Sequence, residues 1–354
     1  MTNALLFKPF LVSLLVAFLS TPLVIVLSRK LNWLEDAQQR SLSYSNVTHQ
    51  GALPRGGGIG IFLAIVVGVS MFLPINPQVQ AIFLATLLTV TVGVIDGIKD
   101  IKPVIRLLTN ALAAMIIIRS GITINFITNP LGGIINLNQT IGPFQFSQLL
   151  TLFWITWSMN FVGWSAGVAG QLPGFVAITS LVVGALSLRF VSGDINQWPV
   201  IVLAGSLAGA YLGFLPFNFY RQKIMPGYSA KSLAGLLLAT LAILSGAKLA
   251  TVILTLAVPT TDAIWAIVRR LKNRQSPFKA DSEHLHHLLL KVGVPQPLVA
   301  VIYWSFSAIL GLIVLQLNSQ QKVWAIVMVG GGVMFLILGL KNIIKRKDQS
   351  SLSA

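Results

Sequence analysis

Apolar runs close to 20 residues long recur along almost the whole chain, and they constrain the fold more than any motif does. A helix needs about 20 mostly apolar residues to cross the hydrocarbon core of a bilayer. With 55% hydrophobic residues, only 10% charged residues and a mean hydropathy of +0.81 over 354 residues, the chain is too apolar for a soluble domain. The sequence therefore predicts an all-α polytopic membrane protein.

The apolar runs divide into about eleven candidate transmembrane helices. They cover residues 4–27, 58–73, 79–95, 104–118, 149–162, 172–188, 200–217, 232–246, 249–268, 297–317 and 323–340. The first run is long, lacks a clear small-residue cleavage site and ends in Arg29-Lys30, so we expect a helix and not a removed signal peptide. Since no repeat or low-complexity linker interrupts the pattern, we expect one integral domain over 1–354.

Basic residues are distributed unequally between the two sides of the predicted bundle. Five of the 25 fall on the side where the chain starts, which leaves 20 on the other: the five are Lys8, Arg119, Arg189, Lys248 and Lys322. The positive-inside rule then places the N-terminus outside and the C-terminus in the cytoplasm, in a multi-pass protein of the cell membrane. The net charge of +16 favours anionic lipid headgroups and phosphorylated substrates at the cytoplasmic face, and we expect no nucleic-acid partner.

The longest outer loop, at about 121–148, contains no titratable side chain. Its β-branched stretches lie on either side of Gly132-Gly133, which predicts a small outer β-hairpin. The chain has no cysteine, which excludes a disulfide, a thiolate nucleophile and a cysteine-ligated metal.

The polar motifs lie in the predicted cytoplasmic loops. In chain order they are Pro54-Arg55-Gly56-Gly57-Gly58 after His49, Asp96 and Asp100 with Arg106, Phe217-Asn218 with Lys223, Asp262, Ser276-Pro277-Phe278, and His284-Leu285-His286-His287. This ordered set, within about 32–289, resembles the polyprenyl-phosphate hexosamine-1-phosphate transferases of glycosyltransferase family 4. That family includes the phospho-N-acetylmuramoyl-pentapeptide transferases and the undecaprenyl-phosphate N-acetylglucosamine-1-phosphate transferases. Residues 297–343 would add C-terminal helices to the family core.

The resemblance implies a magnesium-dependent reaction in cell wall biogenesis, for example of peptidoglycan. A polyprenyl phosphate attacks the β-phosphate of a UDP-amino sugar, releases UMP and leaves a lipid-diphosphate sugar. The partners implied are polyprenyl phosphate, a UDP-amino sugar, membrane lipids and a second subunit in a homo- or heterodimer. The predicted eleven spans are more similar to the N-acetylglucosamine branch than to the pentapeptide branch.

Residue roles follow from the matching motifs. The resemblance assigns Asp96, Asp100 and Asp262 to catalysis, and His49, Arg55, Asn160, Lys223, Lys231, His284, His286 and His287 to substrate binding. Asp96 and Asp100 are also the candidate Mg²⁺ ligands, since residues four apart share one face of a helix. Simpler interpretations remain for several positions: a helix cap for Asp96, ordinary loop cations for His49 and Arg55, and polar loop residues or a transition-metal site for the histidine cluster.

The chain departs from the family at four acidic positions. Gly97 follows Asp96 where the family has a second aspartate, and Ala166, Ala169 and Tyr228 stand at three further acidic positions. Fewer anionic ligands weaken magnesium binding, and metal stabilisation of a transition state amounts to several kcal/mol, on the order of 3–5. Lys99 and Lys231, close to lost acids, offer fixed charges that neutralise phosphate where a metal does so elsewhere.

Three hypotheses remain open from the sequence. The first is a phosphoglycosyl transferase with a carboxylate-poor site, and the second is a non-catalytic homologue that binds polyprenyl phosphate or nucleotide sugar beside an active enzyme. The third is a transporter, although matching broken helices in two halves of the chain are missing. For the enzyme, we expect Asp96→Asn and His286→Ala each to reduce turnover strongly while the protein still assembles in the membrane.

Overall fold

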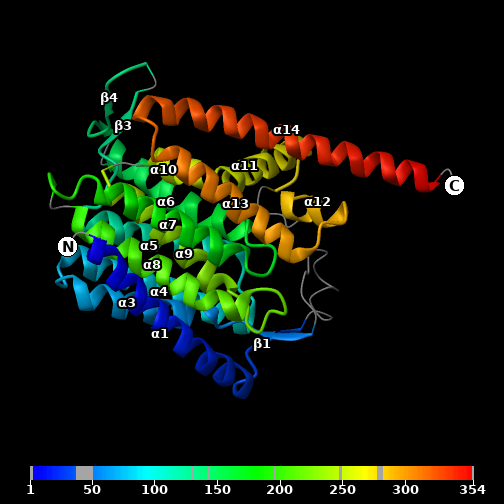
Figure 1. The fold of residues 1–354 in the computed structure, drawn as a ribbon, viewed down its shortest axis with the longest axis horizontal. Coiled ribbons are helices and arrows are strands. Elements are labelled where there is room, and N and C mark those ends of the chain that lie inside the picture. Colours follow the sequence, from blue (N-terminus) through cyan, green and yellow to red (C-terminus); the bar gives the residue numbers. More distant parts are fainter. Residues whose placement is uncertain are drawn as a thin grey trace.

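Helices make up nearly all of the regular structure in the computed structural model, and short strand pairs lie at the ends of the bundle (Figure 1). The structure describes residues 3–36, 51–129, 131–141, 144–194, 197–246, 249–276 and 282–352. The N-terminus and strands β3 and β4 lie at one end, at the left of Figure 1, whereas β1, the short helix α12 and the C-terminus lie at the other. The C-terminal part of the last helix projects beyond the bundle.

Most of the helices follow one another with short connections, but residues 31–56 separate α1 from α3 and residues 120–145 separate α5 from α6. They are α1 (Asn3–Lys30), α3 (Gly57–Phe72), α4 (Pro77–Lys99), α5 (Pro103–Arg119), α6 (Phe146–Trp164), α7 (Gln171–Leu188), α8 (Gln197–Asn218), α9 (Gly227–Leu244), α10 (Leu249–Thr255), α11 (Ala257–Lys272), α12 (Leu285–Lys291), α13 (Gln296–Val314) and α14 (Ser319–Leu352). Proline begins α4 and α5, where its missing N–H costs no helical hydrogen bond.

The predicted fold class is confirmed, but the predicted number of spans is not. Each of the eleven apolar runs is helical in the structure. Among the described residues, seven helices are long and apolar enough to cross a membrane, or eight if the bent pair α10–α11 counts as one span. Helix α3, with 16 residues, is shorter than a usual span. The chain is a multi-pass membrane protein.

Three antiparallel strand pairs complete the described structure. The predicted hairpin is confirmed: β3 (Phe126–Thr128) pairs with β4 (Ile134–Asn136), and it is followed by β5 (Thr140–Ile141) with β6 (Phe144–Gln145). The third pair, β1 (Leu34–Asp36) with β2 (Ala52–Pro54), was not predicted from the sequence. This pair places Glu35 and Arg55 beside the end of α4.

The predicted span 249–268 is not straight. It breaks after Leu256, and the axes of α10 and α11 differ by 83°. Pro259 explains the break, because its ring would clash with the carbonyl of Thr255, four residues earlier and the last residue of α10. The bend directs α11 and its basic last turn toward α6 and α14.

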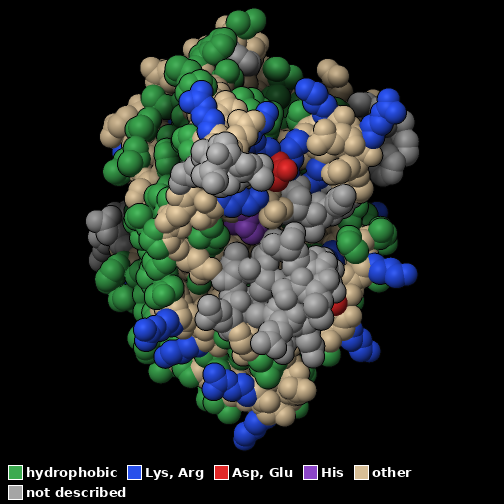
Figure 2. Space-filling model, turned by 90° about the vertical axis from the view of Figure 1, so that its right-hand side faces the viewer, with side chains coloured by type: hydrophobic (Ala, Val, Ile, Leu, Met, Phe, Trp, Pro, Cys, Tyr) green, Lys and Arg blue, Asp and Glu red, His purple; other side chains and the backbone are tan. Residues whose placement is uncertain are grey.

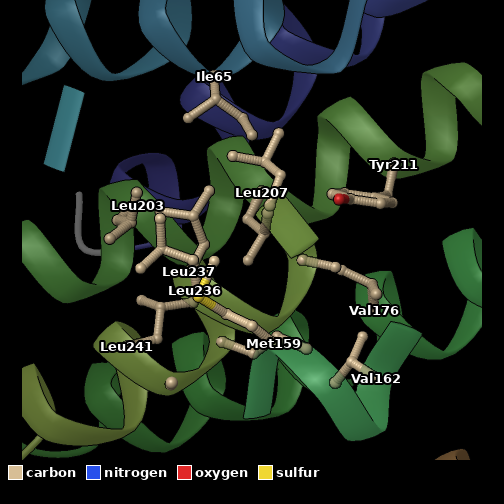
Figure 3. Packing of buried hydrophobic residues seen from close by; sticks show 14 of the residues in the cluster. Ile65, Met159, Val162, Val176, Leu203, Leu207, Tyr211, Leu236, Leu237 and Leu241 are labelled. Atoms are coloured by element: carbon tan, nitrogen blue, oxygen red, sulfur yellow. The ribbon is translucent and has the colours of Figure 1, made fainter. Parts of the chain in front are cut away.

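Close helix packing forms the interior of the bundle. Helix α1 packs along α8, where a Cβ at Gly205, Gly209 or Gly213 would overlap the α1 backbone. Small residues at such spacing allow two helices in a membrane to approach closely. Side chains from α3, α6, α7, α8 and α9 interdigitate in the core, among them Ile65, Met159, Val176, Leu207 and Leu237 (Figure 3). Helix α9 is therefore enclosed on most sides and carries the polar groups at its N-terminal end in fixed positions.

Candidate functional site

The end of α4 holds a buried carboxylate that is bound by arginine. Asp96 is fully buried, and its Oδ1 accepts hydrogen bonds from Arg106 Nε at 2.7 Å and from the backbone N–H of Ile101 at 3.2 Å. Arg106 Nη2 lies 2.6 Å from the same oxygen and 2.7 Å from Asp100 Oδ1. On the other side, Arg55 Nη2 is 3.9 Å from Asp96 Oδ2. Arg106 thus bridges two of the three predicted catalytic carboxylates.

Helix geometry creates this arrangement. Asp100 caps α4 with a left-handed backbone, φ 46°, and its N–H donates to the carbonyl of Asp96. The chain then reverses into α5, which returns Arg106 to the end of α4. Arg55, after β2, also forms an ion pair with Glu35, with 2.9 Å between Nε and Oε2. The cluster therefore joins three segments, namely the β1–β2 pair, the end of α4 and the start of α5.

Tyr228 holds Arg106 from the side of α9. The Arg106 guanidinium lies 5.7 Å from the centre of the Tyr228 ring, and the tyrosine hydroxyl is 2.9 Å from the Arg106 carbonyl oxygen. The same hydroxyl lies 2.6 Å from Asn110 Oδ1, which also accepts a hydrogen bond from Ser232 at 2.8 Å. The Tyr228 phenol therefore fixes α5 against α9.

The second predicted cluster is built on α11 and the start of α12. Asp262 is buried in α11, and its Oδ2 lies 2.7 Å from His284 Nδ1 while its Oδ1 accepts the N–H of Leu285 at 2.8 Å. Arg270 is also buried, with Nη2 3.4 Å from His284 Nε2 and its guanidinium 5.8 Å from the centre of the Trp164 ring. One buried cation is thus held between an imidazole and an indole.

His286 and His287 continue this cluster in the first turn of α12. Their ring centres are 4.2 Å apart, and the His286 ring stacks parallel to that of His284 at 5.7 Å. His286 is buried against Gly167, where any Cβ would overlap the imidazole. Burial lowers the pKa of His286 well below 6.5, and the charges of His287, His284 and Lys231 lower it further. His286 is therefore neutral at pH 7, and its buried Nδ1 has no hydrogen-bond partner among the described residues.

Helix α9 connects the two clusters. Tyr228 belongs to the arginine–carboxylate cluster, whereas Lys231, one turn later, acts electrostatically on His286 and lies beside Gly163 at the end of α6. Figure 2 shows the end of the molecule that carries α12 and β1: Lys and Arg side chains surround a central region in which histidine is visible beside basic side chains. The site rests on α4, α5, α6, α9, α11 and α12, and it combines Arg55, Arg106, Arg270 and Lys231 with the carboxylates of Glu35, Asp96, Asp100 and Asp262.

Other predicted site residues lie elsewhere or outside the described part of the chain. Asn160 is half-buried on α6, and its amide donates to the Thr156 carbonyl of its own helix at 2.7 Å. Lys223 is exposed in the turn after α8, where its backbone N–H donates to Phe217. His49 lies outside the described residues. The structure thus joins Asp96, Asp100 and Arg55 in one cluster, and Asp262 with the three neighbouring histidines in another.

Sequence reasoning gave no role to several residues of the site. Asn110 and Ser232 form the hydrogen-bonded support of Tyr228, and Trp164 lies beside Arg270. A signal existed for Asn110, since a polar amide inside the predicted span 104–118 is costly in a membrane unless it is paired. No comparable sequence signal identifies Trp164, which is one of eight tryptophans.

The carboxylates do not fit a magnesium ion held by the protein. Among the described residues, no group of three His, Asp or Glu side chains could hold a metal ion. Mg²⁺ requires near-octahedral oxygen ligands at about 2.0–2.1 Å, but Oδ1 of Asp96 and Oδ1 of Asp100 already contact the Arg106 guanidinium. A metal bound to both of these oxygens would have to displace Arg106.

Comparisons with known proteins all find the same group of transferases. Residues 79–246 match the sequence profile described as Glycosyl transferase family 4. Decaprenyl-phosphate N-acetylglucosaminephosphotransferase from Mycolicibacterium smegmatis is 30% identical over 69% of this chain and 67% of that protein, and the protein of the same name from Mycobacterium tuberculosis is 29% identical over 85% and 81%. A probable undecaprenyl-phosphate N-acetylglucosaminyl 1-phosphate transferase from Bacillus subtilis is 24% identical over 89% and 85%.

Proposed function

Because this chain belongs to glycosyl transferase family 4, we propose that it transfers a sugar 1-phosphate from a UDP-amino sugar to polyprenyl phosphate. The names of its relatives state a decaprenyl or undecaprenyl phosphate and an N-acetylglucosamine phosphate group. N-acetylglucosamine 1-phosphate is therefore the first group to test, with UMP as the second product.

The observation that carries the proposal is the buried group of Asp262, His284 and Arg270 beside His286. Arg270 is buried, with Nη2 3.4 Å from His284 Nε2 and its guanidinium beside the Trp164 ring, so a positive charge is held inside the histidine cluster. Guanidinium groups bind phosphate oxygens in a bidentate manner, and an imidazole donates or accepts single hydrogen bonds to them. The cluster is therefore suited to bind a diphosphate.

The chemistry needs a balanced exchange of one phosphoanhydride bond for another. An oxygen of the polyprenyl phosphate attacks the β-phosphorus of the UDP-sugar, a new P–O–P bond forms, and the bond between the α- and β-phosphates breaks. UMP leaves with the bridging oxygen and its electron pair. Arg270 and Lys231 would stabilise the charge on the phosphate oxygens, because donors fixed in a dry site lower the barrier most where charge develops.

The proposed orientation places this site in the cytoplasm, where nucleotide sugars occur. The excess of Lys and Arg on the site's side of the membrane supports a cytoplasmic C-terminus. The same charges would attract anionic headgroups and polyprenyl phosphate at the membrane surface. A homodimer or a heterodimer remains part of the proposal from family resemblance.

The direct test is a transfer assay with purified protein in lipid nanodiscs. Undecaprenyl phosphate and UDP-N-acetylglucosamine labelled in the sugar are added with and without Mg²⁺, and the label extracted into the lipid phase is measured. We expect labelled lipid from the wild type and much less from His286→Ala. Arg119→Ala, an exposed arginine at the far end of α5, is the matched control. No labelled lipid with any UDP-amino sugar would rule out the transferase.

The second candidate is a non-catalytic homologue that binds the same ligands. The ion pairs of Arg106 with Asp96 and Asp100 favour it, because they engage two of the three carboxylates that the family resemblance assigns to catalysis. Equilibrium binding of UDP-N-acetylglucosamine without formation of labelled lipid would support this candidate. Binding together with transfer would support the enzyme.

A further inference from the structure

Arg106 occupies the position on Asp96 from which a divalent cation would act. Two of its nitrogens, Nε and Nη2, lie 2.7 and 2.6 Å from Asp96 Oδ1. The Ile101 N–H binds the same oxygen, and Arg55 faces the other one at 3.9 Å. A cation at about 2.0–2.1 Å from Oδ1 would lie within contact distance of the Arg106 guanidinium, whereas Oδ2 has no hydrogen-bond partner among the described residues. The positive charge that a metal brings is therefore already built into the chain.

Contacts with Tyr228 on α9 hold Arg106 in a fixed position. Its carbonyl lies 2.9 Å from the Tyr228 hydroxyl, and its guanidinium lies over the Tyr228 ring. Asn110 and Ser232 hold that hydroxyl in turn. Tyr228 therefore both removes a carboxylate from the site and supports the cation that replaces the metal.

The residue after Asp96, Gly97, also leaves room for an arginine. Gly97 has no side chain, and a Cβ there would lie 3.3 Å from the Arg55 Cβ. Arg55 Nη1 reaches the Gly97 carbonyl at 3.5 Å. Arginine thus fills the space next to Asp96 on two sides. Because 29% of the Arg106 side chain is exposed, an anion from solvent can reach its guanidinium.

We infer that Arg106, supported by Tyr228, replaces a divalent cation at Asp96, so that this chain binds the diphosphate of its ligand without magnesium. The inference rests on the proposed function for the identity of the ligand. The inference adds a separate prediction, that the protein binds no divalent cation at Asp96. Metal binding can be measured without any transfer reaction.

Charge-assisted hydrogen bonds supply the physical basis for the replacement. A fixed guanidinium binds phosphate oxygens with two parallel hydrogen bonds, about twice as strong as neutral ones, and needs no ion from solution. Lys231 lies one turn beyond Tyr228 on α9 and adds an ammonium on the side of the histidines. Chelators should then leave ligand affinity almost unchanged, whereas salt should weaken it.

The first experiment measures metal binding alone. Mn²⁺, a paramagnetic substitute for Mg²⁺, is titrated into the purified protein in nanodiscs and the free ion is followed by electron paramagnetic resonance. We expect no saturable site in the wild type and a saturable site, displaced by Mg²⁺, in the double variant Gly97→Asp with Arg106→Ala. A saturable wild-type site would overturn the inference. So would a double variant that keeps the wild-type melting temperature and still binds no Mn²⁺.

The second experiment measures UDP-N-acetylglucosamine binding in EDTA and in Mg²⁺. We expect the two dissociation constants to agree within about twofold, and Arg106→Ala to weaken binding about tenfold while Arg106→Lys recovers part of the loss. Arg119→Ala on the same helix should bind like the wild type. Loss of wild-type binding in EDTA would overturn the inference. If no nucleotide sugar binds under either condition, the proposed function fails, and the Mn²⁺ titration alone decides the question of the metal.

Discussion

Asp262 and His284 form a buried hydrogen bond across 22 residues of chain, with 2.7 Å between Oδ2 and Nδ1. An ionised carboxylate can only accept, so Nδ1 carries the proton and Nε2 presents its lone pair to Arg270 at 3.4 Å. The other carboxylate oxygen accepts the N–H of Leu285 and holds the first residue of α12. Asp262 therefore acts through His284, as a positioning residue for the cation beside it.

The Asp262→Asn variant should weaken binding of UDP-N-acetylglucosamine by about tenfold, or about 1.4 kcal/mol. The asparagine amide can donate toward His284 Nδ1, which favours the other tautomer and takes the acceptor away from Arg270. Isothermal titration in nanodiscs measures the change. Asp194→Asn, at the far end of the bundle, serves as the control. An unchanged affinity in Asp262→Asn would show that the tautomer has no role.

Two glycines near the histidine cluster give a matched pair of variants. Gly167→Ala places a methyl group on the His286 imidazole, whereas Gly163→Ala meets the Lys231 Cβ at 3.7 Å, an ordinary contact. We expect Gly167→Ala to lower both ligand affinity and melting temperature, because overpacking of a dense site costs about 1–3 kcal/mol. Gly163→Ala should stay within about 0.5 kcal/mol of the wild type. Equal behaviour of the two variants would contradict the packing of His286 against Gly167, in the segment between α6 and α7.

The sequence predicts most of the fold because bilayer thickness sets the length of an apolar helix. All eleven apolar runs are helices, and the outer hairpin forms around Gly132-Gly133. The break at Leu256 was missed because an apolar run is continuous in composition across it, although Pro259 marked the position. The number of complete spans also depends on helix ends such as those of α3, which hydropathy alone does not locate.

The sequence identifies many of the site residues, but it does not show which of them contact one another. Motif matching identified Asp96, Asp262 and the histidines, yet nothing in the sequence states that Arg106 binds both Asp96 and Asp100. That pairing depends on the reversal between α4 and α5, which the left-handed Asp100 allows. Likewise, the replacement of a family carboxylate by Tyr228 is visible in the sequence, but its hydrogen bond to Asn110 needs the packing of α5 on α9.

The contact of α14 with the site should have a small energetic effect. Glu283 forms ion pairs with Lys341 on α14 and with Arg269, whose Nη1 lies 3.0 Å from Glu283 Oε2. The Glu283 side chain is 45% exposed. Exposed ion pairs typically contribute about 0–1 kcal/mol. We therefore expect Lys341→Met to melt within a few degrees of the wild type and to bind UDP-N-acetylglucosamine normally. A large loss of binding would mean that α14 has a direct part in the site.

Stability should fall on acidification because His286 is buried as the neutral base. Burial lowers its pKa in the folded state, and His287, His284 and Lys231 oppose its protonation as well. The unfolded chain takes up a proton below about pH 6.5, whereas the folded chain does not until the pH reaches the lowered pKa. Between these two values the unfolded state binds more protons, so stability is fully present above about pH 6.5 and is lost as the pH falls.

The slope from one such group is at most about 1.4 kcal/mol per pH unit. Melting temperatures of the wild type and of His286→Gln are therefore compared in nanodiscs from pH 8 to pH 5. The two proteins differ only at residue 286, so the difference between the two curves reports His286. We expect the curves to run parallel above about pH 6.5 and the wild type to lose more stability below it. A variant that loses as much as the wild type on acidification would show that His286 accepts its proton freely in the folded state.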